Sequence, residues 1–154
     1  MHLFEENIKN LGLNIPELPK ALANYVPYKI VGKTMYISGQ APVQNGELIY
    51  KGKVGSDINI EDGIEAARMC VTNIIAAVKT GLEGDWDKLD SFVKLTGFVN
   101  CQDDFTDQPK IINGASDMLV EIFGDQGRHA RVAVGSNALP LGISVEIDAI
   151  VQLK

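Results

Sequence analysis

The stretch HARVAVGSNALPLGISVEIDAIVQL, residues 129–153, contains the pattern that decides the fold. It predicts two β-strands, over residues 128–134 and 143–153. Along the second strand apolar residues alternate with polar ones, and this alternation is typical of a strand that buries one face. The apolar set is Ile143, Val145, Ile147 and Ala149, and the polar set is Ser144, Glu146 and Asp148.

The first of these strands carries one cation, Arg131, among valines and alanines. Strand alternation places Arg131, Ala133 and Gly135 on one face and the two valines on the other. An arginine side chain does not lose its charge in proteins. Either Arg131 forms a structural cross-strand ion pair with Glu146, or its planar guanidinium is held ready to bind a carboxylate ligand through two hydrogen bonds. The pattern alone leaves both interpretations open.

The chain before these strands predicts two amphipathic helices with a strand between them. The first helix follows Asn59, which can cap its start, and it ends at Gly81. Its apolar residues recur every three or four positions. The second helix follows Asp107, which can act as its cap, and has Pro109 in its first turn. The strand between the two helices is predicted over residues 89–100.

Shorter elements are expected before the first of these helices. The run YKIVGKTMYISGQ, residues 28–40, predicts a hairpin of two strands joined at Gly32 and Lys33. A short helix followed by a proline-punctuated loop is expected over residues 5–22, and one short strand over residues 47–50.

The order of elements, strand pair, helix, strand, helix and strand pair, predicts a two-layer α+β fold. A mixed sheet of five or six strands would have the two helices on one face. We expect the 154 residues, 1–154, to form a single domain, because this length suits one core. No predicted helix is left to cover the other face. Several apolar residues of these strands make it unfavourable to expose that face to water. They are Phe92, Val93, Leu95, Val132 and Val134. We therefore expect an oligomer.

Composition excludes several classes of function. The formal charge is −6, from 20 acidic and 14 basic side chains, so nucleic-acid binding is not expected. The chain has only His2 and His129 as histidines and no carboxylates at ligand spacing, so no metal site is expected. Cys70 and Cys101 lack C-x-x-C spacing and are expected to be buried free thiols.

No membrane or export signal is expected from the sequence. No apolar run approaches the length that crosses a bilayer, and MHLFEENIKN at the start contains no apolar signal core. We therefore expect a cytoplasmic protein. The sequence also lacks a P-loop, a G-x-G-x-x-G fingerprint and a G-x-S-x-G elbow, which argues against nucleotide hydrolysis and nucleophilic acyl transfer.

Three blocks of the sequence together resemble the YjgF/RidA family, whose best-understood members are reactive-intermediate deaminases. The blocks are YISGQAPV at 36–43, KLTGFVNCQDDF at 94–105 and ARVAVGSNALPLGISVEIDAIV at 130–151. The resemblance covers most of the chain from about Tyr25 onward. It implies a chorismate-mutase-like fold and a homotrimer with sites in the clefts between subunits. It also implies hydrolysis of enamines and imines, such as 2-aminoacrylate, to a 2-keto acid and ammonia, without a cofactor.

The resemblance also implies roles for particular residues. Arg131 matches the family arginine that grips the substrate carboxylate, and Glu146 matches the acidic residue associated with the site and its water. Tyr25 and Ser38 match a tyrosine and a serine of the site, and Asn113 matches a further substrate-binding residue. Tyr25 can equally be an ordinary half-buried aromatic, and Ser38 can merely bond a turn.

Two further features distinguish this chain within the resemblance. Ala133 stands where many members carry a cysteine, and His129 next to Arg131 is typical of a subgroup. Two other functions stay open: a non-catalytic trimer that binds a small carboxylate or a protein partner, and a translation-inhibiting endoribonuclease of the L-PSP type. The acidic net charge and the lack of a histidine pair disfavour the ribonuclease.

Overall fold

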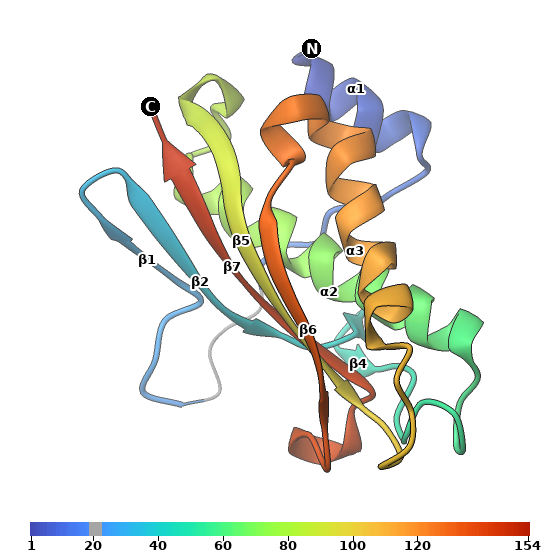
Figure 1. Cartoon of the computed structure of the whole chain (residues 1–154). Helices are drawn as coiled ribbons and strands as arrows, with labels where there is room; N and C mark the ends of the chain where they lie inside the picture. The colour runs from blue at the N-terminus through green and yellow to red at the C-terminus, as the bar shows by residue number, and fades with distance from the viewer. Residues whose placement is uncertain (19–22) are drawn as a thin grey trace.

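A five-stranded sheet and the helices packed on one of its faces form two layers (Figure 1). The computed structural model describes residues 1–18 and 23–154. The sheet order is β1-β2-β7-β5-β6, in which β5 and β6 run parallel and the other neighbours antiparallel. The strands are β1 (Tyr28–Val31), β2 (Thr34–Gln40), β5 (Leu89–Asn100), β6 (Ala130–Ser136) and β7 (Val145–Leu153). The predicted α+β fold with a mixed sheet is therefore confirmed.

The predicted hairpin of β1 and β2 is present, and Gly32 at its turn has φ 61°, a conformation that glycine adopts without strain. The strand predicted over residues 47–50 is shorter, because only β4 (Glu47–Leu48) is extended. It pairs with β3 (Val43–Gln44) as a separate two-stranded ribbon, which the sequence analysis missed. The Asn45-Gly46 turn between them, with φ 53° and 79°, is the dipeptide signal that could have found it.

The two long helices lie where they were predicted, as α2 (Ile60–Gly81) and α3 (Gln108–Phe123). The side chain of Asn59 caps α2 by accepting from the backbone N–H of Asp62 at 2.8 Å. The prediction for Asp107 is wrong in its detail, because its side chain makes no capping hydrogen bond. Its backbone carbonyl accepts from the N–H groups of Lys110 and Ile111 instead, while Pro109 has no N–H to be capped.

The core lies between these helices and the helix-facing side of the sheet. Every apolar residue in the stripe along α3 is buried, as amphipathic spacing requires. These residues are Ile111, Ile112, Ala115, Met118, Leu119, Ile122 and Phe123. The expected free thiols, Cys70 and Cys101, are both buried here. Ser144, expected among the outward-facing residues, is instead fully buried, because it precedes the start of β7 and is not part of its alternation.

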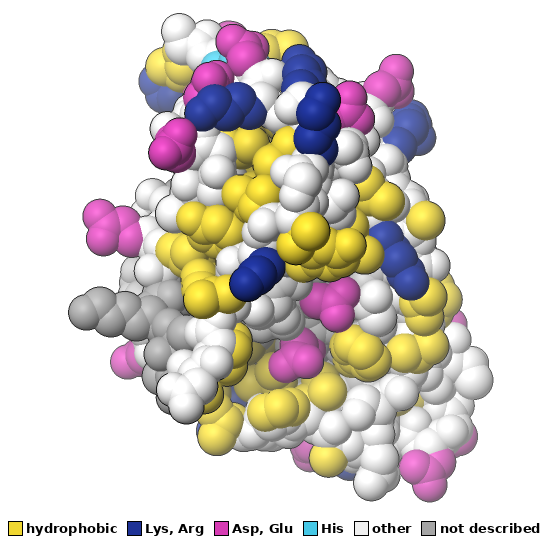
Figure 2. All heavy atoms as spheres, turned by 90° about the vertical axis from the view of Figure 1, so that its left-hand side faces the viewer, with side chains coloured by type: hydrophobic (Ala, Val, Ile, Leu, Met, Phe, Trp, Pro, Cys, Tyr) yellow, Lys and Arg dark blue, Asp and Glu magenta, His cyan; other side chains and the backbone are white. Residues whose placement is uncertain are grey.

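No helix of the described residues covers the opposite side of the sheet (Figure 1), and we call this side the open face. Figure 2 shows hydrophobic side chains gathered on this side, with acidic side chains between them. Val132 and Val134 of β6 point to it, and each is 40% exposed. Phe92 and Leu95 lie on the other side and are buried under the helices, so only part of the set that suggested an uncovered apolar face lies on that face.

The short helix expected near the start of the chain is present as α1 (Leu3–Asn10), which begins two residues earlier than predicted and packs at one end of the molecule. Phe4 of α1 meets the ring of Phe123 edge-on, with centroids 4.9 Å apart. Trp86 donates its indole N–H to Glu5 at 2.7 Å, and Lys79 of α2 pairs with the same carboxylate at 2.8 Å. These contacts hold the short helix against α2 and α3.

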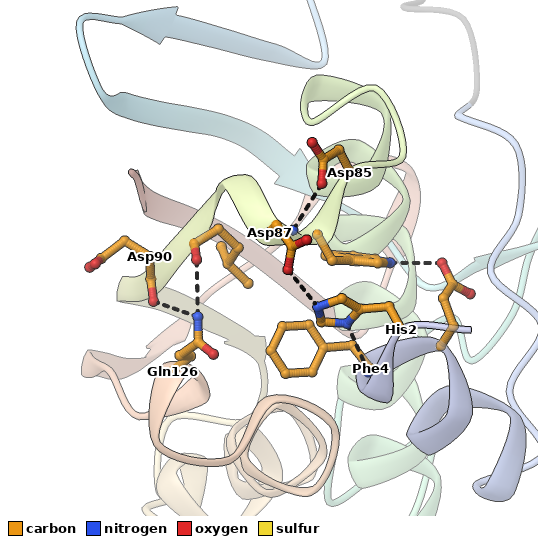
Figure 3. A network of polar contacts seen from close by, with 9 residues as sticks. His2, Phe4, Asp85, Asp87, Asp90 and Gln126 are labelled. Atoms are coloured by element: carbon orange, nitrogen blue, oxygen red, sulfur yellow. Dashed lines mark hydrogen bonds and ion pairs between the residues drawn. The ribbon is translucent and has the colours of Figure 1, made fainter.

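The start of α1 lies against the turn before β5 (Figure 3). His2 caps α1 by accepting from the N–H of Phe4 at 3.2 Å, and its other ring nitrogen lies 3.3 Å from a carboxylate oxygen of Asp87. The loop predicted after this helix extends over residues 19–22, which lie outside the described residues. None of the helices described has both the length and the apolar character needed to cross a membrane.

Candidate functional site

Arg131 lies on β6, one of the two edge strands of the sheet, and its side chain points toward α3. Its Nη1 atom donates to Oδ1 of Asn113 at 2.7 Å and to Oγ of Ser116 at 3.2 Å, and Nη2 donates to the carbonyl of Pro109 at 3.4 Å. These three residues have i, i+4 and i+7 spacing, so they share one face of α3. That face cradles one side of the guanidinium.

The cradle leaves part of the guanidinium available. A guanidinium has five N–H groups, and the two on Nη1 are both used by α3. The hydrogen bonds among the described residues take one of the two on Nη2 and none on Nε. In a guanidinium one Nη2–H lies parallel to Nε–H, and such a pair matches the two oxygens of a carboxylate.

The structure overturns the interpretation of Arg131 as an ion-pair partner of Glu146. Strands β6 and β7 do not pair, because β5 lies between them: Leu95 of β5 is opposite both Arg131 and Ala149. Glu146 also points to the open face, while Arg131 points to the helix side. None of the ion pairs found among the described residues includes Arg131.

Glu146 is the second residue of β7, the middle strand of the sheet, and lies on the open face against β2. Gly39 faces it so closely that a Cβ on Gly39 would lie 3.1 Å from both Cδ and Oε2 of Glu146. The β2–β7 register shifts between Ile37 and Gln40, which is where this contact occurs. Burial, together with the charge of Asp148 on the same face, raises the pKa of Glu146 above its ordinary value.

Ser38 directly precedes Gly39 on β2, and Tyr25 lies in the segment before β1. The hydroxyl of Ser38 donates to the carbonyl of Val26 at 2.6 Å, and its backbone N–H donates to the carbonyl of Pro27 at 3.0 Å. These two hydrogen bonds hold the segment that carries Tyr25. They agree with the alternative in which Ser38 only forms hydrogen bonds within a turn. Tyr25 is 56% exposed and lines a shallow pocket with Ser38 and Tyr36.

The predicted site residues therefore form two clusters. The arginine cluster contains Arg131 and Asn113, joined by Ser116 and His129, whose Nε2 lies 2.9 Å from Oγ of Ser116. We group the remaining predicted residues, Glu146 on β7 with Ser38 and Tyr25 of the neighbouring pocket, as the carboxylate cluster. Within one chain the two clusters lie on opposite sides of the sheet.

Neither the sequence pattern nor the family resemblance assigned a role to Ser116. Its position three residues after Asn113, on the helix face that also carries Pro109, is a signal that could have found it. Within the described residues, no group of three or more histidine, cysteine, aspartate or glutamate side chains is placed to hold a metal ion.

Comparison with known proteins assigns the chain to a family. The family described as "YjgF/chorismate_mutase-like, putative endoribonuclease" matches residues 5–151. The chain belongs to this family. The YjgF-family assignment agrees with the two-layer fold and with the three sequence blocks that suggested it.

Several relatives of this YjgF-family chain span most of its length. Protein TCP17 of Trypanosoma cruzi is 38% identical over 149 residues, which cover 96% of this chain and 92% of TCP17. The crystal structure of Atu1372 from Agrobacterium tumefaciens, described as having unknown function, is 43% identical, with a TM-score of 0.93 and coverage of 99% and 93%. The structure of E. coli TdcF with bound serine is 25% identical, with a TM-score of 0.60 and coverage of 88% and 93%.

Proposed function

We propose that this protein is a hydrolytic deaminase of reactive enamines and imines that carry a carboxylate, such as 2-aminoacrylate. The observation that supports this most directly is the guanidinium of Arg131, which is fixed through Nη1 while Nε–H and one Nη2–H stay available. The serine in E. coli TdcF is a small molecule with a carboxylate, which supports a carboxylate ligand in this chain as well.

The proposed site is shared between neighbouring copies of a homotrimer. A small substrate cannot touch both clusters of one chain, because they lie on opposite sides of the sheet. The exposed valines of β6 and the exposed ring of Tyr36 also leave an apolar surface on the open face. If the β6 edge of one copy packs against the open face of the next, the same contact covers these valines and brings Arg131 toward the next copy's carboxylate cluster.

The chemistry needs binding, one water and proton transfers. Protonation of the enamine at its terminal carbon gives the iminium ion, and water then adds to the iminium carbon. One proton moves from this water to the nitrogen, the other is released as the C–N bond breaks and the C=O bond forms, and ammonia departs. The product is a 2-keto acid whose new oxygen comes from the water. In this proposal Arg131 holds the substrate carboxylate, and Glu146 or a backbone carbonyl holds the water. The reaction as written requires no cofactor.

The environment of Glu146 suits this role. A carboxyl group whose pKa is raised exchanges protons closer to neutral pH than an ordinary glutamate does. Tyr25, Ser38 and Asn113 are proposed as substrate-binding residues. Ser38 and Asn113 would act by holding the segments that carry Tyr25 and Arg131 as much as by direct contact.

The test is a coupled assay in which a dehydratase generates 2-aminoacrylate and the appearance of pyruvate is followed. The native protein should accelerate this step, while Arg131→Ala should lose the acceleration and Arg131→Lys should recover little, because lysine cannot form the two parallel hydrogen bonds. Equal acceleration by Arg131→Ala and the native protein would refute the proposed anchor.

Mixing two inactive variants tests the shared site. When Arg131→Ala and Glu146→Gln subunits are unfolded and refolded together at equal ratio, about a quarter of the subunit contacts, counted over all the trimers that form, pair a native arginine with a native glutamate. We expect activity to return to about that fraction. Both clusters acting within one chain would give no recovery. Separate refolding of each variant is the control.

A non-catalytic trimer that binds a small carboxylate is the second candidate, because the same guanidinium serves it equally well. A thermal shift with 2-ketobutyrate that disappears in Arg131→Ala, without any acceleration of 2-aminoacrylate hydrolysis, would select it. The endoribonuclease named in the family description ranks third, since the net charge of −6 opposes binding to a phosphate backbone.

A further inference from the structure

Behind Arg131 lies a short chain of hydrogen bonds that reaches the buried turn after α3. Nδ1 of His129 lies 2.6 Å from the carbonyl oxygen of Gly127, and Nε2 lies 2.9 Å from Oγ of Ser116. The same Oγ accepts from Nη1 of Arg131 at 3.2 Å. The chain therefore runs from the backbone of Gly127 through His129 and Ser116 to the guanidinium.

The backbone fixes the direction of every hydrogen bond in this chain. A carbonyl oxygen only accepts, so the ring proton of His129 must be on Nδ1. In the neutral ring Nε2 then has a lone pair and accepts the hydroxyl proton of Ser116. The remaining lone pairs of Ser116 Oγ face Nη1 of Arg131, which is a donor only.

The surroundings favour the neutral ring that this arrangement requires. Burial is the largest influence and lowers the pKa of His129 below its ordinary value. The hydrogen bond to Gly127 raises this pKa by less, and the charge of Arg131 lowers it by a still smaller amount. The pocket that contains the ring is lined by Asp117 of α3 and by Arg128 and Arg131 on the β6 side. Gly127 itself is buried, and a Cβ there would lie 2.2 Å from the carbonyl oxygen of Leu119. The turn therefore offers the ring a rigid anchor.

We propose that Ser116 and His129 are positioning residues for Arg131. The ring of His129 sets the direction of the Ser116 hydroxyl, and the hydroxyl together with Asn113 holds Nη1, so that Nε–H and Nη2–H stay aligned for a carboxylate. This inference rests on the proposed function, in which Arg131 anchors the substrate. It adds that the anchor is preorganised through a histidine that does not touch the substrate.

The expected effect follows from what fixing a side chain costs. Holding one flexible side chain in place during binding weakens affinity by about 2- to 12-fold if it was not held beforehand. Calorimetric titration with 2-ketobutyrate should therefore show Ser116→Ala and His129→Phe binding about 2- to 12-fold more weakly than the native protein. Ser116→Thr keeps the hydroxyl and should bind within about twofold of native. Glu121→Gln, an exposed change on α3, is the control and should bind like native.

The variants separate this inference from the proposed function. If Arg131→Ala binds as well as the native protein, or the native protein does not bind at all, the carboxylate anchor itself is wrong. If Arg131→Ala loses binding while Ser116→Ala and His129→Phe bind like native, the anchor stands and the positioning role is overturned. Equal losses in Ser116→Ala and Ser116→Thr would also overturn it, because the hydroxyl would then not be the cause.

A spectroscopic measurement tests the geometry without any ligand. Nitrogen-15 spectra of the neutral His129 ring should show the proton on Nδ1 and a bare Nε2. The bound proton should stay on Nδ1 in Arg131→Ala, because the carbonyl of Gly127 sets it. A neutral ring with its proton on Nε2 would contradict the proposed chain of hydrogen bonds.

Discussion

Replacing Phe4 with alanine should destabilise the protein strongly, although this residue lies in a short helix near the start of the chain. Phe4 is 6% exposed, and its ring packs edge-on against Phe123 and Trp86, with centroids 4.9 and 6.1 Å away. Truncating a buried phenylalanine costs about 3–5 kcal/mol of unfolding free energy. For a chain of this length each kcal/mol lowers the melting temperature by about 2–4 °C, so the expected decrease is about 6–20 °C.

The assay uses the only tryptophan in the chain as its reporter. Trp86 is 3% exposed under α1 and donates its indole N–H to Glu5 of that helix (Figure 3). An isolated helix of eight residues is not stable in water, so α1 depends on these packing contacts. Loss of Phe4 should therefore shift the emission of Trp86 toward that of a solvated indole below the main melting transition.

Leu3→Ala is the matched control, because it removes an apolar side chain from the neighbouring position of the same helix. Leu3 is 61% exposed, so this change should alter the unfolding free energy by no more than about 0.5 kcal/mol. If Phe4→Ala and Leu3→Ala melt at the same temperature and leave the emission of Trp86 unchanged, α1 is not packed as the structure has it.

Three other predictions concern the two clusters. Gly39→Ala should lower the rate of the proposed deaminase about tenfold, because the new methyl group displaces the carboxyl group of Glu146. A crystal structure of the variant would locate that carboxyl group. A reduced rate with an unmoved carboxyl group would show that displacement of Glu146 is not the reason for the loss. Glu146→Gln should melt at a higher temperature than the native protein at pH 7. A glutamate whose pKa is raised in the folded state destabilises the folded protein as the pH rises above the unfolded pKa of about 4.3. The higher melting temperature of Glu146→Gln should therefore disappear near pH 4 in a series of melting curves. Arg131→Ala should raise the pKa of His129, since a nearby positive charge is removed; proton NMR of the ring measures this, and an unchanged titration would place the guanidinium elsewhere.

Periodicity predicted the layers of this fold because side-chain spacing follows directly from backbone geometry. The alternation in β7 and the three-or-four spacing in α3 each place one set of residues against the core, and those sets are buried. The order of strands in the sheet does not follow from spacing. The last two predicted strands were taken as a pair, yet β7 enters between β2 and β5 and leaves β6 at the edge.

That difference in strand order explains why the ion pair of Arg131 with Glu146 was a reasonable but wrong alternative. Alternation fixes which residues of one strand share a face, but it says nothing about which strand lies next to it. The parallel pairing of β6 with β5 turns Arg131 toward α3, and the antiparallel pairing of β7 turns Glu146 to the open face. A contact with α3, eighteen positions away in sequence at Asn113, carries no periodic signal.

The roles of Arg131, Glu146, Tyr25 and Ser38 came from resemblance and not from pattern, and they stay proposals. The structure does give a physical reason for a cation at the start of a valine-rich strand. An edge strand has one side free of neighbours, so the long side chain of Arg131 can reach past the sheet to the polar face of α3 and keep its charge near water.

The same edge position links the anchor to assembly. Val132 and Val134 alternate with Arg131 along β6, so the valines face the open side of the sheet and Arg131 faces α3. A partner that covers the valines at this edge of the sheet therefore also comes within reach of the guanidinium. A Val132→Lys change would place a charge in that contact. Because Val132 is exposed in the single chain, the change should have little effect on the free energy of unfolding of the monomer. If the site is shared, Val132→Lys should lose both the trimer, as measured by light scattering, and the deaminase activity. A monomeric Val132→Lys protein with native activity would show instead that each chain carries a complete site of its own.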